Sequence, residues 1–166
     1  MKNPWDAVVN GEEECQRLLS QCAERLNSVL VPWGFNFQHK ERGSGHRGPY
    51  ATGIFERGPL RIHLAHGSTW LGLVHYELET IVVHGYLRER ITHTLMHSSY
   101  MRQVGHGSEC RLIEKDMTSI ARDGRDAVEA LLWDLREYAA PTLRQECDEF
   151  AKIAERGYRG YEVLKN

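Results

Sequence analysis

The sequence lacks the segments that would place it in or across a membrane. No apolar run approaches the roughly 20 residues that a transmembrane helix needs. The N-terminal residues 1–6 are without the apolar stretch of a signal peptide. A cytoplasmic protein with no membrane contact is therefore the default expectation.

An excess of charge of one sign is also missing. Lys and Arg total 21 and Asp and Glu total 23, which gives a formal net charge of −2. Dedicated nucleic-acid binders usually carry a strong basic excess, so this balance argues against a nucleic-acid partner. The four cysteines include no CxxC pair, so the sequence does not indicate a zinc ribbon or a thioredoxin-like redox protein. Buried, idle thiols in a reducing compartment are expected instead.

What the chain does contain is typical of one soluble globular domain. At 166 residues it has the length of a single domain, and no linker, internal repeat or low-complexity block divides residues 1–166. Apolar residues make up 41% and charged residues 27%, which is ordinary for a globular protein.

The clearest element is an amphipathic helix over residues 11–30. Asn10 is a candidate N-cap, and Pro32 and Gly34 end the helix. Apolar residues recur at steps of three and four, as one buried helical face requires. This stripe consists of Cys15, Leu18, Leu19, Cys22, Leu26, Val29 and Leu30.

The central segment, residues 35–84, predicts strands folded back on one another. Alternating apolar and polar residues indicate four or five strands, the last of them a short candidate. The links between them are short, which favours antiparallel pairing. The strands are expected at 35–39, 50–55, 60–64, 69–79 and 81–84, with a flexible hairpin loop at 43–49 and a candidate bulge at Gly53.

The sequence after residue 84 predicts mostly helices. Leu87, Ile91 and Leu95 step by four and predict a helix up to about His97. The conformation of residues 98–122 stays open, with a loop at 105–108 and residues 110–113 as either a strand or a packed segment. A helix beginning at 123 or 124 ends or kinks at Pro141, another follows to about residue 156, and the tail from 157 is expected to be loosely ordered. The fold class is α+β, with the helices covering one face of the sheet.

Residues 43–48 match the GxGxxG string of nucleotide-binding loops. The phosphate-binding mechanism requires a helix to start at the last glycine, whereas Pro49 and a strand follow here. No GxSxG elbow is present, and carboxylates such as Asp134 and Glu137 are expected on helix surfaces. We therefore assign no catalytic residue and expect no cofactor.

Nine histidines raise the question of a metal site. His93 and His97 would share one face of a helix, although the glutamate of an HExxH motif is missing. A metal-assisted hydrolase using these two and a third histidine is one alternative function. His63 and His75 are expected not to share an ion, because pairing of their strands about a turn at residues 66–67 would place them roughly 13 Å apart.

The segment from residue 39 to 66 is locally basic. Its cations, with Tyr50 and Phe55 nearby, make a surface for single-stranded nucleic acid a second alternative. A solvated sheet face with charged loop tips is the simpler interpretation. The cations are Lys40, Arg42, Arg47, Arg57 and Arg61.

Several short motifs resemble a family of uncharacterised small bacterial α+β proteins, some of which are presumed immunity proteins encoded beside polymorphic toxins. The resemblance implies a bacterial cytoplasmic protein without assigned activity, and it transfers no catalytic residues. The chain departs from the expected pattern after Ile113, where a loop containing Pro and Gly would be expected. The motifs span residues 48–55, 71–76, 84–86, 99–102 and 132–138.

These observations favour a non-enzymatic module that binds a protein partner, in the manner of an immunity protein. The polar sheet face and the 43–49 loop would form the binding surface. The partner's identity and the oligomeric state stay open, as does the choice between packing and function for His84 and Tyr86. The candidate binding residues are Tyr50, Arg61, His63, His75, His84 and Tyr86.

Overall fold

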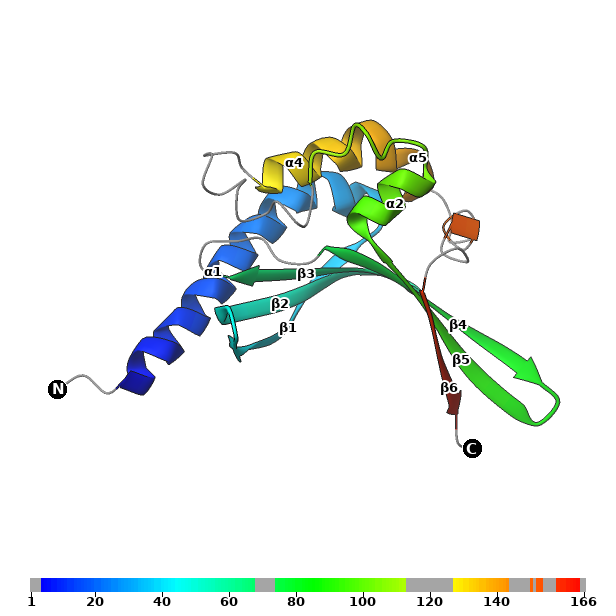
Figure 1. Cartoon of the computed structure of the whole chain (residues 1–166), viewed down its shortest axis with the longest axis horizontal. Helices are drawn as coiled ribbons and strands as arrows, with labels where there is room; N and C mark the ends of the chain where they lie inside the picture. The colour runs from blue at the N-terminus through cyan, green and yellow to red at the C-terminus, as the bar shows by residue number, and fades with distance from the viewer. Residues whose placement is uncertain are drawn as a thin grey trace.

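The protein combines one antiparallel sheet with helices packed on one of its faces (Figure 1). The computed structural model describes residues 4–67, 74–112, 127–143, 150, 152–153 and 158–164. The predicted α+β architecture is confirmed. The elements are α1 (Pro4–Leu30), the 3-10 helix η1 (Val31–Trp33), β1 (Asn36–Gly45), β2 (Gly48–Arg57), β3 (Leu60–Gly67), β4 (His75–His84), β5 (Leu87–Met96), α2 (His97–Gln103), α4 (Ala127–Asp134), the π-helical turn η3 (Leu135–Ala139), α5 (Ala140–Leu143) and β6 (Tyr158–Leu164).

Helix α1 lies across β1, β2 and β3 and buries its apolar stripe there. Leu19, Leu26 and Leu30 are completely buried, as the spacing of the stripe predicts. The helix begins at Pro4, earlier than expected, and Pro at a first helical turn costs no hydrogen bond. Within the described part of the chain, no helix is both long and apolar enough to cross a membrane.

Strands β1 to β4 form the predicted antiparallel meander, and β5 continues it. Two-residue turns join β1 to β2, β2 to β3 and β4 to β5. The hairpin expected at 43–49 is present, but its loop is shorter than predicted: Gly45 pairs with Gly48, so only residues 46 and 47 form the turn and the rest of the segment is strand. His84 likewise pairs with Leu87 across Gly85 and Tyr86. Gly85 has φ +60°, a conformation that glycine adopts without strain and that a two-residue hairpin turn needs.

The β-bulge lies in β1, and not at Gly53 as expected. His39 pairs with Gly53 and Arg42 with Ala51, so two residues of β1 oppose one residue of β2. Gly53 serves this arrangement by leaving room for Phe37, whose ring lies 2.5 Å from where a Cβ would stand.

Two predictions for the second half of the sheet were wrong. Residues 87–96, expected to be helical, form β5 and pair along their whole length with β4. The tail expected to be loosely ordered forms β6, which pairs with β5 at the edge of the sheet. Residues 81–84 continue β4 and are not a separate strand. Of the strand predicted at 69–79, residues 69–73 lie outside the described residues.

The C-terminal helices complete the core. Val128, Leu131 and Leu135 are buried as predicted, and the helix widens into the π-helical turn η3 just before Pro141. A proline has no N–H for the bond to the preceding turn, which accounts for the departure from α-helical geometry there. Of the helix predicted beyond α5, only Phe150, Lys152 and Ile153 are described, and all three are helical.

Candidate functional site: a histidine pair on the open face of the sheet

The strands place apolar side chains on one face and polar side chains on the other. Ile62, Tyr76 and Leu78 point toward the helices and are buried. Because side chains alternate along a strand, His63 and His75 point to the opposite face. No described helix covers that face (Figure 1), which we call the open face.

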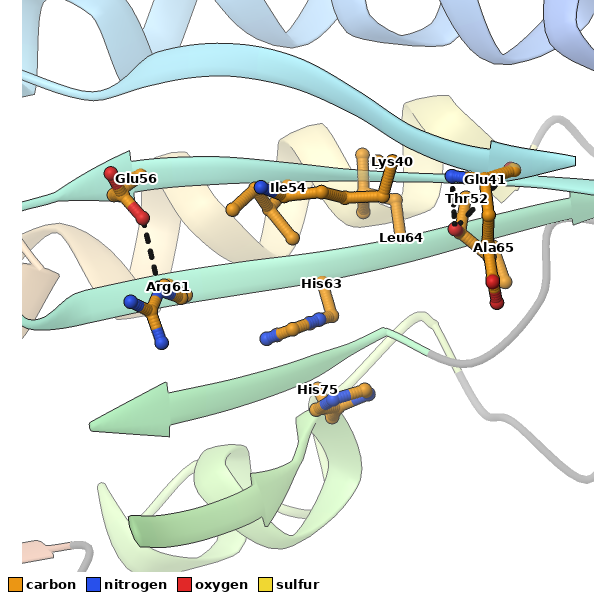
Figure 2. Close-up of a pocket in the computed structure, with 11 residues that line it drawn as sticks. Lys40, Glu41, Thr52, Ile54, Glu56, Arg61, His63, Leu64, Ala65 and His75 are labelled. Atoms are coloured by element: carbon orange, nitrogen blue, oxygen red, sulfur yellow. Dashed lines mark hydrogen bonds and ion pairs between the residues drawn. The ribbon is translucent and has the colours of Figure 1, made fainter. Parts of the chain in front are cut away.

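The register between β3 and β4 brings His63 directly opposite His75. Their rings stack with centroids 4.3 Å apart and planes 9° from parallel. Figure 2 shows the two imidazoles facing each other, one from each strand. The prediction that they lie too far apart to share an ion was wrong. It assumed a tight turn at residues 66–67, whereas β3 continues to Gly67 and β4 does not begin until His75.

Glu77 joins the pair from the next outward position on β4. Its Oε2 lies 3.5 Å from Nε2 of His63. Its Oε1 accepts a hydrogen bond of 3.1 Å from Arg61, the direct cross-strand neighbour of Glu77. The two oxygens of this carboxylate therefore face different partners, a guanidinium and an imidazole.

Arg61 is the centre of a partly buried ion-pair network. It donates hydrogen bonds to Glu56 at 2.9 Å and to Glu79 at 3.4 Å, in addition to Glu77. The hydrogen bond to Glu56 is the main cause of the raised pKa of Arg61. Glu79 also pairs with Arg90 of β5 at 3.4 Å. These contacts hold the carboxylates beside the histidines in place.

Burial favours the neutral form of both histidines. Desolvation is the main cause that lowers the pKa of His75 to about 4, and the neighbouring His63 acts in the same direction while Glu77 opposes it. Desolvation also lowers the pKa of His63, again against the influence of Glu77. Nε2 of His63 is buried and makes no hydrogen bond, although Oε2 of Glu77 faces it at 3.5 Å.

A hollow of about 560 Å³ lies beside the pair on the open face. Side chains of β1, β2 and β3 form its walls together with His75 (Figure 2). Small molecules or side chains of another protein could therefore reach the imidazoles from this side. The lining includes Lys40, Thr52, Ile54, Arg61, His63 and His75.

The structure separates the other candidate binding residues from this site. Tyr50 lies at the far end of β2, where it pairs with Gly43 and Gly67. His84 and Tyr86 lie at the tip of the β4–β5 hairpin. Since His84 is nine positions along β4 from His75, the two are about 30 Å apart in an extended strand. Only Arg61, His63 and His75 of the six candidates come together.

His93 and His97 do not form the helical pair on which the hydrolase alternative rested. His93 lies in β5 and His97 begins α2, because the expected helix is a strand. His97 is completely buried and contacts Tyr76 and Asp134 instead. Within the described residues, the groupings that could hold a metal are His63 with His75 and Glu77, and His97 with Cys110 and Asp134.

The cluster around Asp134 is a buried structural network. A carboxylate only accepts hydrogen bonds, so His97 donates from Nε2 at 2.9 Å, and its Nδ1 is hydrogen-bonded to the Tyr76 hydroxyl at 2.7 Å. Backbone N–H groups of Arg111 and Leu112 donate to the same carboxylate. Burial acts to raise the pKa of Asp134, but these hydrogen bonds outweigh it and lower the pKa. The expectation that Asp134 lies on a helix surface was wrong.

Three of the five cations in segment 39–66 are engaged within the protein. Arg57 donates to the backbone carbonyls of Trp33 and Leu143. Arg42 donates to Gln16, and Arg61 is surrounded by glutamates. These guanidinium groups bind other parts of the protein, which argues against the single-stranded nucleic-acid alternative.

Comparison of the chain with protein-family models, with curated proteins and with solved structures gives no match.

Proposed function

We propose that this protein is a binding module whose β4–β5 hairpin docks onto a partner protein. The observation that carries the proposal is that this hairpin extends beyond the helices (Figure 1) and exposes apolar side chains in its outer half. Exposed clusters of large apolar side chains commonly mark protein interaction sites. The exposed fractions are 48% for Ile81, 61% for Val83, 98% for Tyr86 and 62% for Leu87.

The chemistry of the hairpin supports a partner with an apolar pocket and an acidic rim. Tyr86 is almost fully exposed, and tyrosine is among the residues that most often anchor protein interfaces. Val83 pairs directly with Arg88, so an exposed guanidinium accompanies the apolar surface on the same face. A carboxylate on the partner would meet Arg88 while the pocket receives Tyr86.

An immunity-type role, with a toxin as the partner, stays a prediction within this proposal. The hairpin replaces the 43–49 segment as the expected contact region, because that segment is a tight turn and not an adaptable loop.

Site-specific photo-crosslinking in the native host tests the proposal. A photoreactive phenylalanine analogue at position 86 or 83 is expected to trap a distinct protein, whereas the same analogue at position 31 is not. Val31 is a matched control because it is 50% exposed and begins η1, outside the hairpin.

The affinity of the purified partner for variants of the hairpin is then measured. Tyr86→Ala and Arg88→Glu are each expected to weaken the affinity about tenfold or more, and Val31→Ser to leave it unchanged. Adducts only with a second copy of the chain, adducts with nucleic acid, or no adduct at positions 83 and 86 would each overturn the proposal.

A further inference from the structure

We propose that His63, His75 and Glu77 form a binding site for a divalent transition metal on the open face. Their potential ligand atoms, two imidazole nitrogens and a carboxylate oxygen, all lie within 4.8 Å of one another. In a tetrahedral site with metal–ligand bonds near 2.0–2.1 Å, neighbouring ligand atoms stand roughly 3.3 Å apart. The site therefore needs a contraction of about 1.5 Å at most.

Rotation of side chains is enough for this contraction, because the backbone already holds the three residues in position. His63 and His75 are direct cross-strand partners, whose Cβ atoms in such pairs stand about 5 Å apart. Glu77 is two residues beyond His75 and so lies on the same face of β4. The two rings, now stacked, would turn their nitrogens toward a common point above the sheet.

The electrostatic state of the ligands suits a cation. Metals bind the neutral form of histidine, and burial of the two rings favours that form by lowering the pKa of both. Nε2 of His63 is buried without a hydrogen-bond partner, which is a cost that a metal bond would remove.

Arg61 orients the carboxylate of Glu77 through the oxygen that does not face His63. It holds Oε1 of Glu77 at 3.1 Å and leaves Oε2 facing His63. Support of this kind for a metal-binding carboxylate fixes its direction, as outer residues do in protein metal sites. The positive charge of Arg61 is balanced by Glu56 and Glu79, which contact the same guanidinium.

The ligand set selects the class of metal. Two imidazoles and one carboxylate suit Zn²⁺, Cu²⁺, Ni²⁺ or Co²⁺, whereas Mg²⁺ and Ca²⁺ prefer oxygen ligands alone. Three protein ligands leave a coordination position open, and the hollow of about 560 Å³ beside the pair gives it access to solvent. Water or a side chain of another molecule would fill that position.

Titration calorimetry of tag-free, metal-stripped protein tests this site with Zn²⁺ and Ni²⁺. One ion per chain is expected to bind, with a Kd of about 10 µM or tighter, and Mg²⁺ is expected not to bind. His63→Gln and His75→Gln are each expected to weaken Zn²⁺ binding about tenfold or more. His46→Gln and His84→Gln are the matched controls, because both residues are exposed and outside the site.

A second readout separates metal binding from a loss of fold. In NMR spectra of the histidine rings, addition of Zn²⁺ is expected to shift the signals of His63 and His75 and to leave those of the buried His97 unchanged. Absence of binding in the folded wild-type protein would overturn the proposal, as would equal affinities in the His63→Gln and His75→Gln variants. Loss of binding in the His46 or His84 controls alone would overturn it too, by assigning the ion to surface histidines.

Discussion

At the scale of single residues, the two histidine clusters differ in what surrounds them. His63 and His75 lie at a partly open surface, and Nε2 of His63 has no hydrogen-bond partner. His97 is completely buried, and both its nitrogens have partners in Tyr76 and Asp134. The first cluster has an unused bonding capacity and access from outside, which binding requires. The second is satisfied and closed, which is typical of a structural role.

The prediction at this scale concerns the variant Asp134→Asn. An asparagine keeps one acceptor oxygen and turns an amide donor toward the N–H groups of His97, Arg111 or Leu112, which leaves buried donors unsatisfied. We expect a loss of about 2–4 kcal/mol in the free energy of unfolding, measured by urea denaturation. Glu137→Gln, at an exposed position of the following π-helical turn, is the control and is expected to change stability by under about 0.5 kcal/mol. Equal stabilities of the two variants would contradict the structural role of Asp134.

At the scale of elements, β1 and β2 fit each other through the bulge and through the absence of a side chain at Gly53. Phe37 packs its ring over Gly53 and stands 5.0 Å, centroid to centroid, from Phe55. The ring can approach β2 this closely only because Gly53, the residue opposite His39, has no Cβ. The strand pair therefore depends on a glycine inside a strand, where glycine otherwise weakens a sheet.

Gly53→Ala tests this fit. The added Cβ would stand 2.5 Å from the Phe37 ring and 3.0 Å from the backbone oxygen of Gln38, so either the ring or the strand must move. We expect a loss of about 1–3 kcal/mol in the free energy of unfolding, the usual cost of overpacking. Gly45→Ala is the control in the same strand pair, because its Cβ would meet its nearest neighbour, Tyr50, at an ordinary 3.9 Å. A Gly53→Ala protein as stable as Gly45→Ala would show that Phe37 does not need the gap.

At the scale of the whole molecule, the core occupies one end of the sheet. The helices cover β1 to β3 and the inner parts of β4 and β5, where Tyr76, Leu78 and Leu95 are buried. The outer half of the β4–β5 hairpin extends past them and is supported along β5 by β6 (Figure 1). The molecule thus joins a packed body to a projecting arm, and the proposed docking surface lies on the arm.

Hydrogen exchange should report this division. Amides hydrogen-bonded between β4 and β5 in the outer segments, residues 81–84 and 87–90, lack buried side chains to stabilise them. We expect them to exchange at least about tenfold faster, after correction for intrinsic rates, than those of residues 75–78 and 93–96. Uniform protection along the whole hairpin would contradict a weakly stabilised arm.

Some elements follow from local sequence alone, and some do not. The apolar stripe of α1 and the apolar–polar alternation of β3 could be predicted from the sequence. The first fits only the period of a helix, and the second fits only the period of a strand. Leu87, Ile91 and Leu95 could not be assigned in this way, because a step of four fits one face of a helix and equally one face of a strand. The pairing of this segment with β4 on one side and β6 on the other made it a strand. The sequence of β6 shows no alternation of apolar and polar residues, and this segment is a strand because it pairs with β5.

The sequence by itself determined the α+β class, the buried face of α1 and the alternation that sends His63 and His75 to the polar side of the sheet. These depend on near neighbours in the chain, whose spacing is fixed by backbone geometry. Only the tertiary structure decided that His63 stands opposite His75, that Arg61 reaches Glu77, and that Asp134 is buried against His97. Each of those contacts depends on strand register or helix packing, and a shift of one residue in register would have sent the histidines to opposite faces.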